Sequence, residues 1–236
     1  MGNGLSQQWM DTVDRSQTDK RWNDLDTNIK SVVDEFNTRL GARLRTSGFK
    51  KLDFRLIKAM VWTESGGPDS SAWKTRPMQI GNPGDPGLHE LLSNETGGIL
   101  TPELKKELQK GVATPDSNIK AGVAFLLMRA ATFVWESVPD PSDVKGSVVE
   151  VKGGDNLDTI AKAHSTTIEM LKTLNPEIGN GKLIKAGQRL KSRRAQIHRK
   201  ITGWVEITTE FAARRYNVGD PKYKQKLDYC LSIMPP

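Results

Sequence analysis

The sequence has little of the chemistry that builds metal centres, disulfide frameworks or membrane spans. Its one cysteine, Cys230, cannot form a disulfide within the chain. Its three histidines are scattered and do not show the spacing of metal ligands. No segment approaches the roughly 18 consecutive apolar residues that cross a bilayer. We therefore expect no metal, no organic cofactor and no stable insertion into a membrane.

The N-terminus also lacks the features of a secretory signal. Its first residues, MGNGLSQQWMDTVDR, are polar and acidic, without a basic start or an apolar middle. We therefore expect synthesis in the cytoplasm without a signal peptide. Aromatic residues are absent from the basic segment 182–200, whereas binding of single-stranded nucleic acid usually combines cations with aromatic rings. This absence weighs against nucleic acid as a partner.

The composition is that of a soluble globular protein. The 236 residues are 36% hydrophobic and 27% charged, enough for one large domain or two modest ones. The net charge of +7 favours an anionic partner, which could be nucleic acid, a membrane surface or the bacterial cell wall. Charge alone does not choose among these.

The stretch 56–80 combines a buried helix with a carboxylate at its end. Apolar residues recur at helical spacing up to Trp62, and Glu64 follows just before Gly66, Gly67 and Pro68. Glycine tolerates the left-handed conformation and proline cannot continue a helix, so the helix is expected to end there. Partial burial would raise the pKa of this carboxyl group, as a general acid requires. The alternative is an ordinary exposed glutamate at a helix end.

Two short segments carry a family resemblance. Glu64-Ser65-Gly66, followed by Met78-Gln79-Ile80 in a Gly/Pro-rich loop, resembles the soluble lytic transglycosylases, whose fold is similar to goose-type lysozyme. The resemblance implies a mainly α, lysozyme-like catalytic domain with a small hairpin. It also implies that Glu64 acts first as acid and then as base. The family's serine near the sugar N-acetyl group would correspond to Ser70 or Ser71. The implied substrate-binding residues are Ser65, Ser71, Met78, Gln79 and Asn217.

Helical periodicity continues outside this stretch. Residues 1–18 look like a loose N-terminal arm, and residues 19–44 have the pattern of an amphipathic helix. Residues 81–98 are rich in Gly, Pro, Asp and Asn, which predicts a loop. Residues 118–138 are apolar nearly all round, which predicts a central helix, and residues 138–142 look like a linker.

Residues 146–192 resemble LysM, a βααβ module that binds glycans containing N-acetylglucosamine. The similarity covers V-K-G-G-D-N-L, then L-N-P, then A-G-Q before the last strand. In that family the sugar lies between the loop after the first strand and the loop after the second helix. Leu157 and Asn175 could instead serve mainly to maintain the fold. The implied glycan-binding residues are Gly154, Asp155, Asn156, Leu157, Asn175, Pro176, Glu177 and Ile178.

The C-terminal segment resembles the closing part of the transglycosylase domain, where A-x-x-Y-N-x-G precedes a final helix. Tyr216 and Asn217 occupy this pattern. The resemblance therefore implies a discontinuous catalytic domain, 19–142 and 195–236, with the LysM module inserted. Tyr216 should then lie close to Glu64 and orient it as a second catalytic residue. A contiguous catalytic domain with an unrelated tail is the alternative.

The implied function is cleavage of the MurNAc-β-1,4-GlcNAc bond of peptidoglycan, giving 1,6-anhydro products. A hydrolytic muramidase on the same fold is an alternative, and it would need a second carboxylate such as Asp69, Asp85 or Asp116. A wall-binding protein without catalysis is another.

The expected site of action is the periplasm or cell wall of a target bacterium. Two routes fit a chain without a signal: an antibacterial effector, for instance of type VI secretion, or a phage endolysin. An effector would have an immunity protein as partner.

Overall fold

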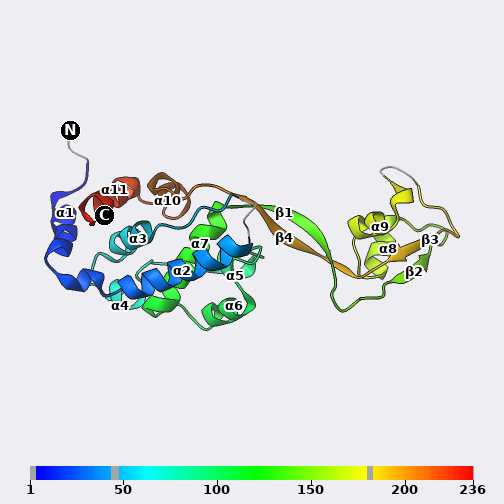
Figure 1. Ribbon diagram of the computed structural model, residues 1–236, viewed down its shortest axis with the longest axis horizontal. Helices are drawn as coiled ribbons and strands as arrows, with labels where there is room; N and C mark the ends of the chain where they lie inside the picture. Colours follow the sequence, from blue (N-terminus) through cyan, green and yellow to red (C-terminus); the bar gives the residue numbers. More distant parts are fainter. Residues whose placement is uncertain (1–3, 44–47, 180–182, 236) are drawn as a thin grey trace. The chain divides into compact units, whose positions relative to one another are not determined.

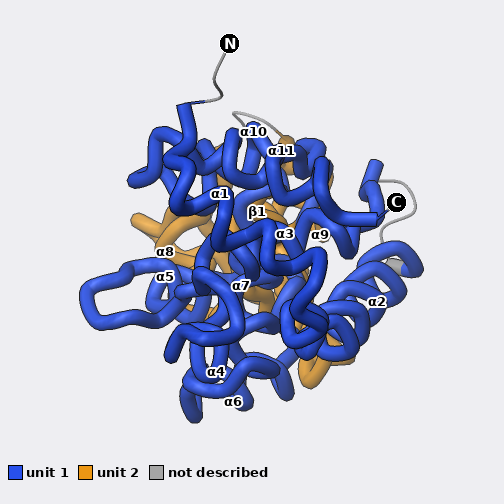
Figure 2. The backbone as a smooth tube through the Cα atoms, turned by 90° about the vertical axis from the view of Figure 1, so that its left-hand side faces the viewer, with its two compact units in different colours: residues 1–132, 201–236 blue, residues 133–200 orange. Residues whose placement is uncertain are grey.

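A computed structural model describes residues 4–43, 48–179 and 183–235. Within these ranges the chain is mainly helical, as expected, with four strands in two separate two-stranded sheets (Figure 1). It divides into two compact units (Figure 2). Residues 1–132 and 201–236 form one, here named the helical unit, and residues 133–200 form the other, here named the small unit.

The helical unit contains most of the helices. In chain order they are α1 (Gln7–Asp14), α2 (Asp26–Arg43), α3 (Phe54–Ser65), α4 (Ser71–Thr75), α5 (Gly87–Ser93), α6 (Pro102–Gln109), α7 (Pro115–Ala130), α10 (Thr209–Arg215) and α11 (Tyr223–Ile233). Helix α3 packs against α2 and α11, and α7 packs against α2 and α5. The core of this unit is thus shared by segments from both ends of the chain.

The N-terminal segment is not the loose arm that its polar composition predicts. Ser6 caps α1, and Val13 within it is buried. The ring of Trp9 packs edge-on against Tyr229 of α11, and the Tyr229 hydroxyl donates to Asp14 at 2.7 Å. Contacts with a distant part of the chain therefore stabilise a helix that local composition does not reveal.

The second predicted helix begins later than expected. Residues Lys20–Asn23 form a 3-10 turn, and α2 starts at Asp26. The apolar stripe predicted for this region is nevertheless buried throughout: Trp22, Leu25, Ile29, Val32, Val33, Phe36 and Leu40.

The predicted helix 118–138 is wrong in its second part. Helix α7 starts one turn earlier, at a capping box made by Thr114 and Ser117, and ends at Ala130. Residues Ala131–Pro139 form strand β1, which pairs with β4 (Ala195–Trp204). The sequence there, ATFVWESVP, is rich in β-branched and aromatic residues, which favour a strand. Val138 and Pro139 of the expected linker are the end of this strand, and residues 140–142 follow it.

The ribbon of β1 and β4 is antiparallel. The amide of Asp140 donates to the carbonyl of Arg194 at one end, and that of Val205 donates to Ala130 at the other. Most of this ribbon groups with the small unit. Residues 133–142 and 195–200, assigned from sequence to the larger domain, therefore belong structurally to the smaller one.

The rest of the small unit has the order β2 (Ser147–Glu150), α8 (Leu157–Ala163), α9 (Ile168–Leu174) and β3 (Arg189–Ser192). Strands β2 and β3 are antiparallel, with Val149 opposite Leu190. This confirms the predicted βααβ order. One apolar cluster forms its core: Val149, Val151, Ile160, Ala161, Leu171, Ile178 and Leu190.

Candidate functional site

Glu64 lies at the C-terminal end of α3, as the sequence predicts. Asp53 caps the start of this helix by accepting a hydrogen bond from the amide of Arg55 at 2.8 Å. Gly66 ends it in the left-handed conformation, with φ of 73°. The body of the helix is buried, so the Glu64 side chain is delivered from the core to the edge of a loop.

A cavity of about 280 Å³ lies beside Glu64. It brings together five of the residues predicted for catalysis and substrate binding: Glu64, Met78, Gln79, Tyr216 and Asn217. Ile80, Asp85, Gly87 and Phe125 complete the lining.

The Glu64 carboxyl group is half-buried, and its burial raises its pKa above the ordinary value. The Tyr223 hydroxyl and the Asn217 amide act in the opposite direction, because both favour the ionised carboxylate. The Asn217 amide donates to Glu64 Oε1 at 3.2 Å. The net result is a carboxyl group that keeps its proton to higher pH than an exposed glutamate.

Charged and aromatic groups of the C-terminal segment also surround Glu64, and sequence reasoning missed them. Tyr223 is fully buried; its hydroxyl acts on the pKa of Glu64 but makes no hydrogen bond of standard geometry with any described residue. Asp220 forms an ion pair with Lys226 at 2.7 Å, and the two act on the pKa of Glu64 in opposite directions. A tyrosine on an otherwise apolar helix face carries no sequence signal beyond that of a core residue.

Tyr216 lines the same cavity as Glu64, but its hydroxyl does not orient the Glu64 carboxylate directly. Its hydroxyl donates instead to the main-chain carbonyl of Met78, at 2.8 Å. Gly122 of α7 makes room for this contact, since a Cβ there would lie 2.6 Å from the Met78 sulfur and 2.8 Å from the Tyr216 oxygen. Tyr216 therefore positions the segment that carries Met78, and Asn217 is the residue that contacts the carboxylate.

A buried asparagine of α7 anchors the segment 78–80. Asn118 accepts from the amide of Met78 at 2.8 Å and donates to the carbonyl of Ile80 at 2.9 Å. Between them, Gln79 has a positive φ of 53°, an uncommon conformation for a residue with a side chain. Its side chain is bonded to the carbonyl of Arg76 and to Asn82. Strained backbone of this kind concentrates at ligand sites.

The two predicted serines lie outside the cavity lining. The Ser65 hydroxyl donates to the carbonyl of Val61 at 2.6 Å and accepts from the amide of Gly67. Ser65 thus closes the end of α3. Ser71 is exposed at the first position of α4, where Ser70 provides the cap.

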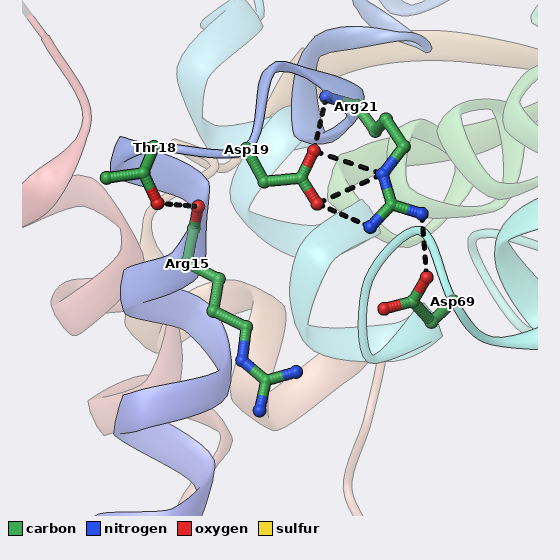
Figure 3. A network of polar contacts seen from close by, with 5 residues as sticks. All are labelled: Arg15, Thr18, Asp19, Arg21 and Asp69. Atoms are coloured by element: carbon green, nitrogen blue, oxygen red, sulfur yellow. Dashed lines mark hydrogen bonds and ion pairs between the residues drawn. The ribbon is translucent and has the colours of Figure 1, made fainter.

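Of the carboxylates considered for a hydrolase, Asp85 lines the cavity. Its two oxygens accept from the amides of Gly81 and Gly87, at 2.8 and 2.9 Å. Asp69 is exposed and pairs with Arg21 at 2.8 Å (Figure 3), and Asp116 pairs with Lys120 at 2.8 Å.

Part of the loop predicted at 81–98 is helical. Residues Gly87–Ser93 form α5, whose Leu91 is fully buried, and α5 packs against α7.

Within the described ranges, no group of three or more His, Cys, Asp or Glu side chains could hold a metal ion. Nor does any helix of the described chain combine the length and apolar character of a membrane span.

In the small unit, the predicted glycan-binding residues fall into two groups. Asn175 is buried, and its amide donates to the carbonyls of Leu171 and Lys191 and accepts from the Lys191 amide, each at 2.7 Å. Ile178 is part of the core, and Leu157 packs against the same cluster. These three residues maintain the fold and bring the loops after β2 and α9 to a common core.

The other predicted residues of the two loops are more accessible. Gly154 is exposed, with φ of 89°, and Pro176 and Glu177 are exposed. Asp155 accepts from the amide of Lys152 at 2.7 Å, and Asn156 caps α8. The exposed parts of these two loops are therefore Gly154, Asn156, Pro176 and Glu177.

Comparison with known proteins identifies the small unit. Residues 149–193 match the model of the LysM domain family. The match confirms the predicted LysM module and indicates binding to peptidoglycan or a related glycan. Neither the comparison with curated proteins nor that with solved structures found a match. The resemblance of the helical unit to lytic transglycosylases therefore stays a prediction.

Proposed function

We propose that this protein cleaves the MurNAc-β-1,4-GlcNAc bond of peptidoglycan by lytic transglycosylation. The observation that supports this most is Glu64, a half-buried carboxyl group with a raised pKa at the wall of a cavity. A general acid that works near neutral pH needs such an environment. The lysozyme-like fold of the helical unit is part of the same proposal.

In the first step, the proton of Glu64 passes to the glycosidic oxygen while the bond from that oxygen to C1 of the muramic residue breaks. The N-acetyl group of that sugar stabilises the positive charge that develops at C1. The hydrogen bond from Asn217 stabilises the Glu64 carboxylate formed by the transfer.

In the second step, the same carboxylate removes the proton of the 6-hydroxyl of the muramic residue. The 6-oxygen then bonds to C1, which gives the 1,6-anhydro product and restores protonated Glu64. No water is consumed. Met78 and Gln79, positioned by Asn118 and Tyr216, would line the bound sugar.

A hydrolytic muramidase is the second candidate, and Asp85 is the observation that favours it. This carboxylate lines the same cavity as Glu64 and could position a water molecule to attack C1. Both of its oxygens accept main-chain hydrogen bonds, which supports a role in organising the loop instead.

The LysM domain would keep the enzyme on its polymeric substrate. A tethered domain raises the effective concentration of glycan at the cavity without adding contacts there. This contribution should matter most with insoluble peptidoglycan and little with short soluble fragments.

Mass spectrometry of the soluble products from purified peptidoglycan tests these proposals. The chain would be compared with Glu64→Gln, Asp85→Asn and, as a matched control, Asp69→Asn, whose carboxylate is exposed outside the cavity. We expect anhydro-muropeptides that vanish only with Glu64→Gln. Reducing-end products that need both Glu64 and Asp85 would establish the muramidase. If the unaltered chain released no products, the remaining explanation would be a wall-binding protein without catalysis.

We also propose that the protein is an antibacterial effector acting in the periplasm of another bacterium. The net charge of +7 supports attraction to an anionic wall. The chain directed to the periplasm should lyse cells, and Glu64→Gln should not. A protein that protects cells by occupying the cavity would be the immunity partner, and a phage endolysin would have none.

A further inference from the structure

One face of the ribbon formed by β1 and β4 carries stacked aromatic and cationic side chains. Side chains alternate between the two faces of a strand, so Phe133 and Trp135 share one face of β1. The guanidinium of Arg199, from β4, lies 4.0 Å from the centre of the Phe133 ring and 5.6 Å from that of Trp135. We name the surface formed by Phe133, Trp135, Ile197 and Arg199 the ribbon face.

The ribbon face is open to solvent. Trp135 is 64% exposed and Ile197 is 46% exposed. In the described chain, β1 and β4 form a sheet of their own without a third strand. Contiguous exposed apolar surface rimmed by polar groups commonly marks a binding site.

Hydrogen bonds connect this ribbon to the LysM domain. Ser137, on the same face as Trp135, shares a hydrogen bond of 2.5 Å with Thr167, the cap of α9. On the other strand, the amide of Ala195 donates to Ser165 at 3.1 Å, and the Thr166 hydroxyl donates to the carbonyl of Arg193. The ribbon face is therefore attached by hydrogen bonds to a domain of glycan-binding type.

We propose that the ribbon face is a glycan-binding surface, separate from the LysM loops at 154–157 and 175–178. The exposed Trp135 indole offers a flat apolar face to the C–H face of a pyranose ring of a β-1,4-linked N-acetylhexosamine strand. The Arg199 guanidinium, stacked beside it, adds a positive charge that favours a glycan bearing carboxylates. Peptidoglycan carries such carboxylates on its lactyl and peptide groups.

Charge and continuity support this occupant. The LysM domain, to which the ribbon is hydrogen-bonded, indicates glycan binding, so the ribbon face extends a surface of that type. A polyanionic glycan would also be attracted by the net charge of +7. A second copy of the chain carries the same net charge and would be repelled.

The test is co-sedimentation of the full chain with purified peptidoglycan sacculi. All variants carry Glu64→Gln so that binding is measured without cleavage, which keeps this result independent of the proposed reaction. We expect Trp135→Ala to weaken binding about ten-fold, as for a central aromatic contact. Val134→Ala is the matched control, because Val134 is the exposed neighbour of Trp135, at 46%, and points to the opposite face.

The outcomes separate the possibilities. Unchanged affinity with Trp135→Ala, in a variant with an unaltered circular dichroism spectrum, would overturn the proposal. So would a change from dimer to monomer in sedimentation, since the ribbon face would then join two copies. The proposal would also be overturned if Trp135→Ala weakened binding to a single-stranded DNA oligonucleotide, or to vesicles of anionic lipid, as much as it weakened binding to sacculi. Loss confined to sacculi and chitin oligosaccharides would support it.

Discussion

The amide of Asn217 donates a hydrogen bond to the carboxylate of Glu64 across a separation of 153 residues in the chain. The contact joins the end of α3 to the turn after α10, so the segment that follows the LysM domain completes the cavity that the N-terminal part begins. The acid strength of Glu64 therefore depends on both parts of the chain.

Replacement of Asn217 by alanine should shift the pH dependence of the proposed peptidoglycan cleavage. The Asn217 amide lowers the pKa of Glu64, so its loss should raise that pKa further. Because Glu64 must be protonated to act as an acid, the alkaline limb of the activity profile should move to higher pH. Asn94→Ala, at the end of α5, is the control. An unmoved limb would show that Glu64 does not act as the acid.

Glu64→Gln should stabilise the fold in a pH-dependent way. Burial raises the pKa of Glu64 in the folded protein, so its stabilising contribution is complete below the unfolded pKa and is lost as pH rises through the folded pKa. Glutamine does not ionise. The variant should therefore match the unaltered chain in thermal unfolding near pH 4 and melt at higher temperature at pH 7 to 8. If the variant and the unaltered chain melted at the same temperature at pH 7 to 8 as well as near pH 4, the raised pKa of Glu64 would be contradicted.

The helices that could be predicted from the sequence are those whose starts and ends are marked by capping residues or glycine. Asp53 and Thr101 are capping residues that start α3 and α6, and Gly66 ends α3 as expected. Helix α1 has no such signal at its end, and the composition that favours a strand after Ala130 does not by itself decide against a helix. The first depends on contacts with Tyr229, and the second on pairing with β4. Tertiary contacts decide such segments, and a local pattern does not contain them.

The same distinction applies to the candidate site. Glu64, Met78 and Asn217 could be placed together because short segments resemble one family, and the cavity contains all three. The contribution of Tyr223 could not be predicted, because it arises only when α11 packs against α3. Likewise, the basic segment 182–200 lacks aromatic residues, yet β1 places Trp135 beside Arg199. Pairing of strands creates a surface that neither strand contains.

Gly122→Ala should disturb the cavity, whereas Gly41→Ala should not. A Cβ at Gly122 would approach the Met78 sulfur and the Tyr216 hydroxyl too closely, so we expect a loss of about 1–3 kcal/mol in the free energy of unfolding, together with lower activity. Gly41 lies in α2 with open space around its Cβ position. Alanine there should stabilise the chain by about 0.4–1 kcal/mol. Denaturant unfolding measures both changes, and a harmless Gly122→Ala would show that Tyr216 and Met78 can separate freely.

Alkaline titration should find no tyrosine that ionises at the ordinary pKa. The chain has three tyrosines, Tyr216, Tyr223 and Tyr229. Burial raises the pKa of the first two well above 10, and the hydrogen bond to Asp14 raises that of Tyr229 to about 12. Absorbance at ~295 nm should therefore change little near pH 10. Asp14→Asn should lower the pKa of Tyr229, and an unchanged titration of that variant would mean that α1 does not pack on α11.

Asn175→Ala should weaken glycan binding through the fold of the LysM domain. The amide of Asn175 forms three hydrogen bonds, and at roughly 1 kcal/mol each their loss should cost about 2–4 kcal/mol of unfolding free energy. Glu177 is exposed, so Glu177→Ala should leave thermal unfolding unchanged while it reduces binding to chitin oligosaccharides if that loop contacts sugar. Hydrogen exchange of residues 149–193 would measure the first effect. Should Asn175→Ala lose binding with undiminished protection, Asn175 would be a ligand contact, because a structural residue cannot be removed without exposing the amides that it connects.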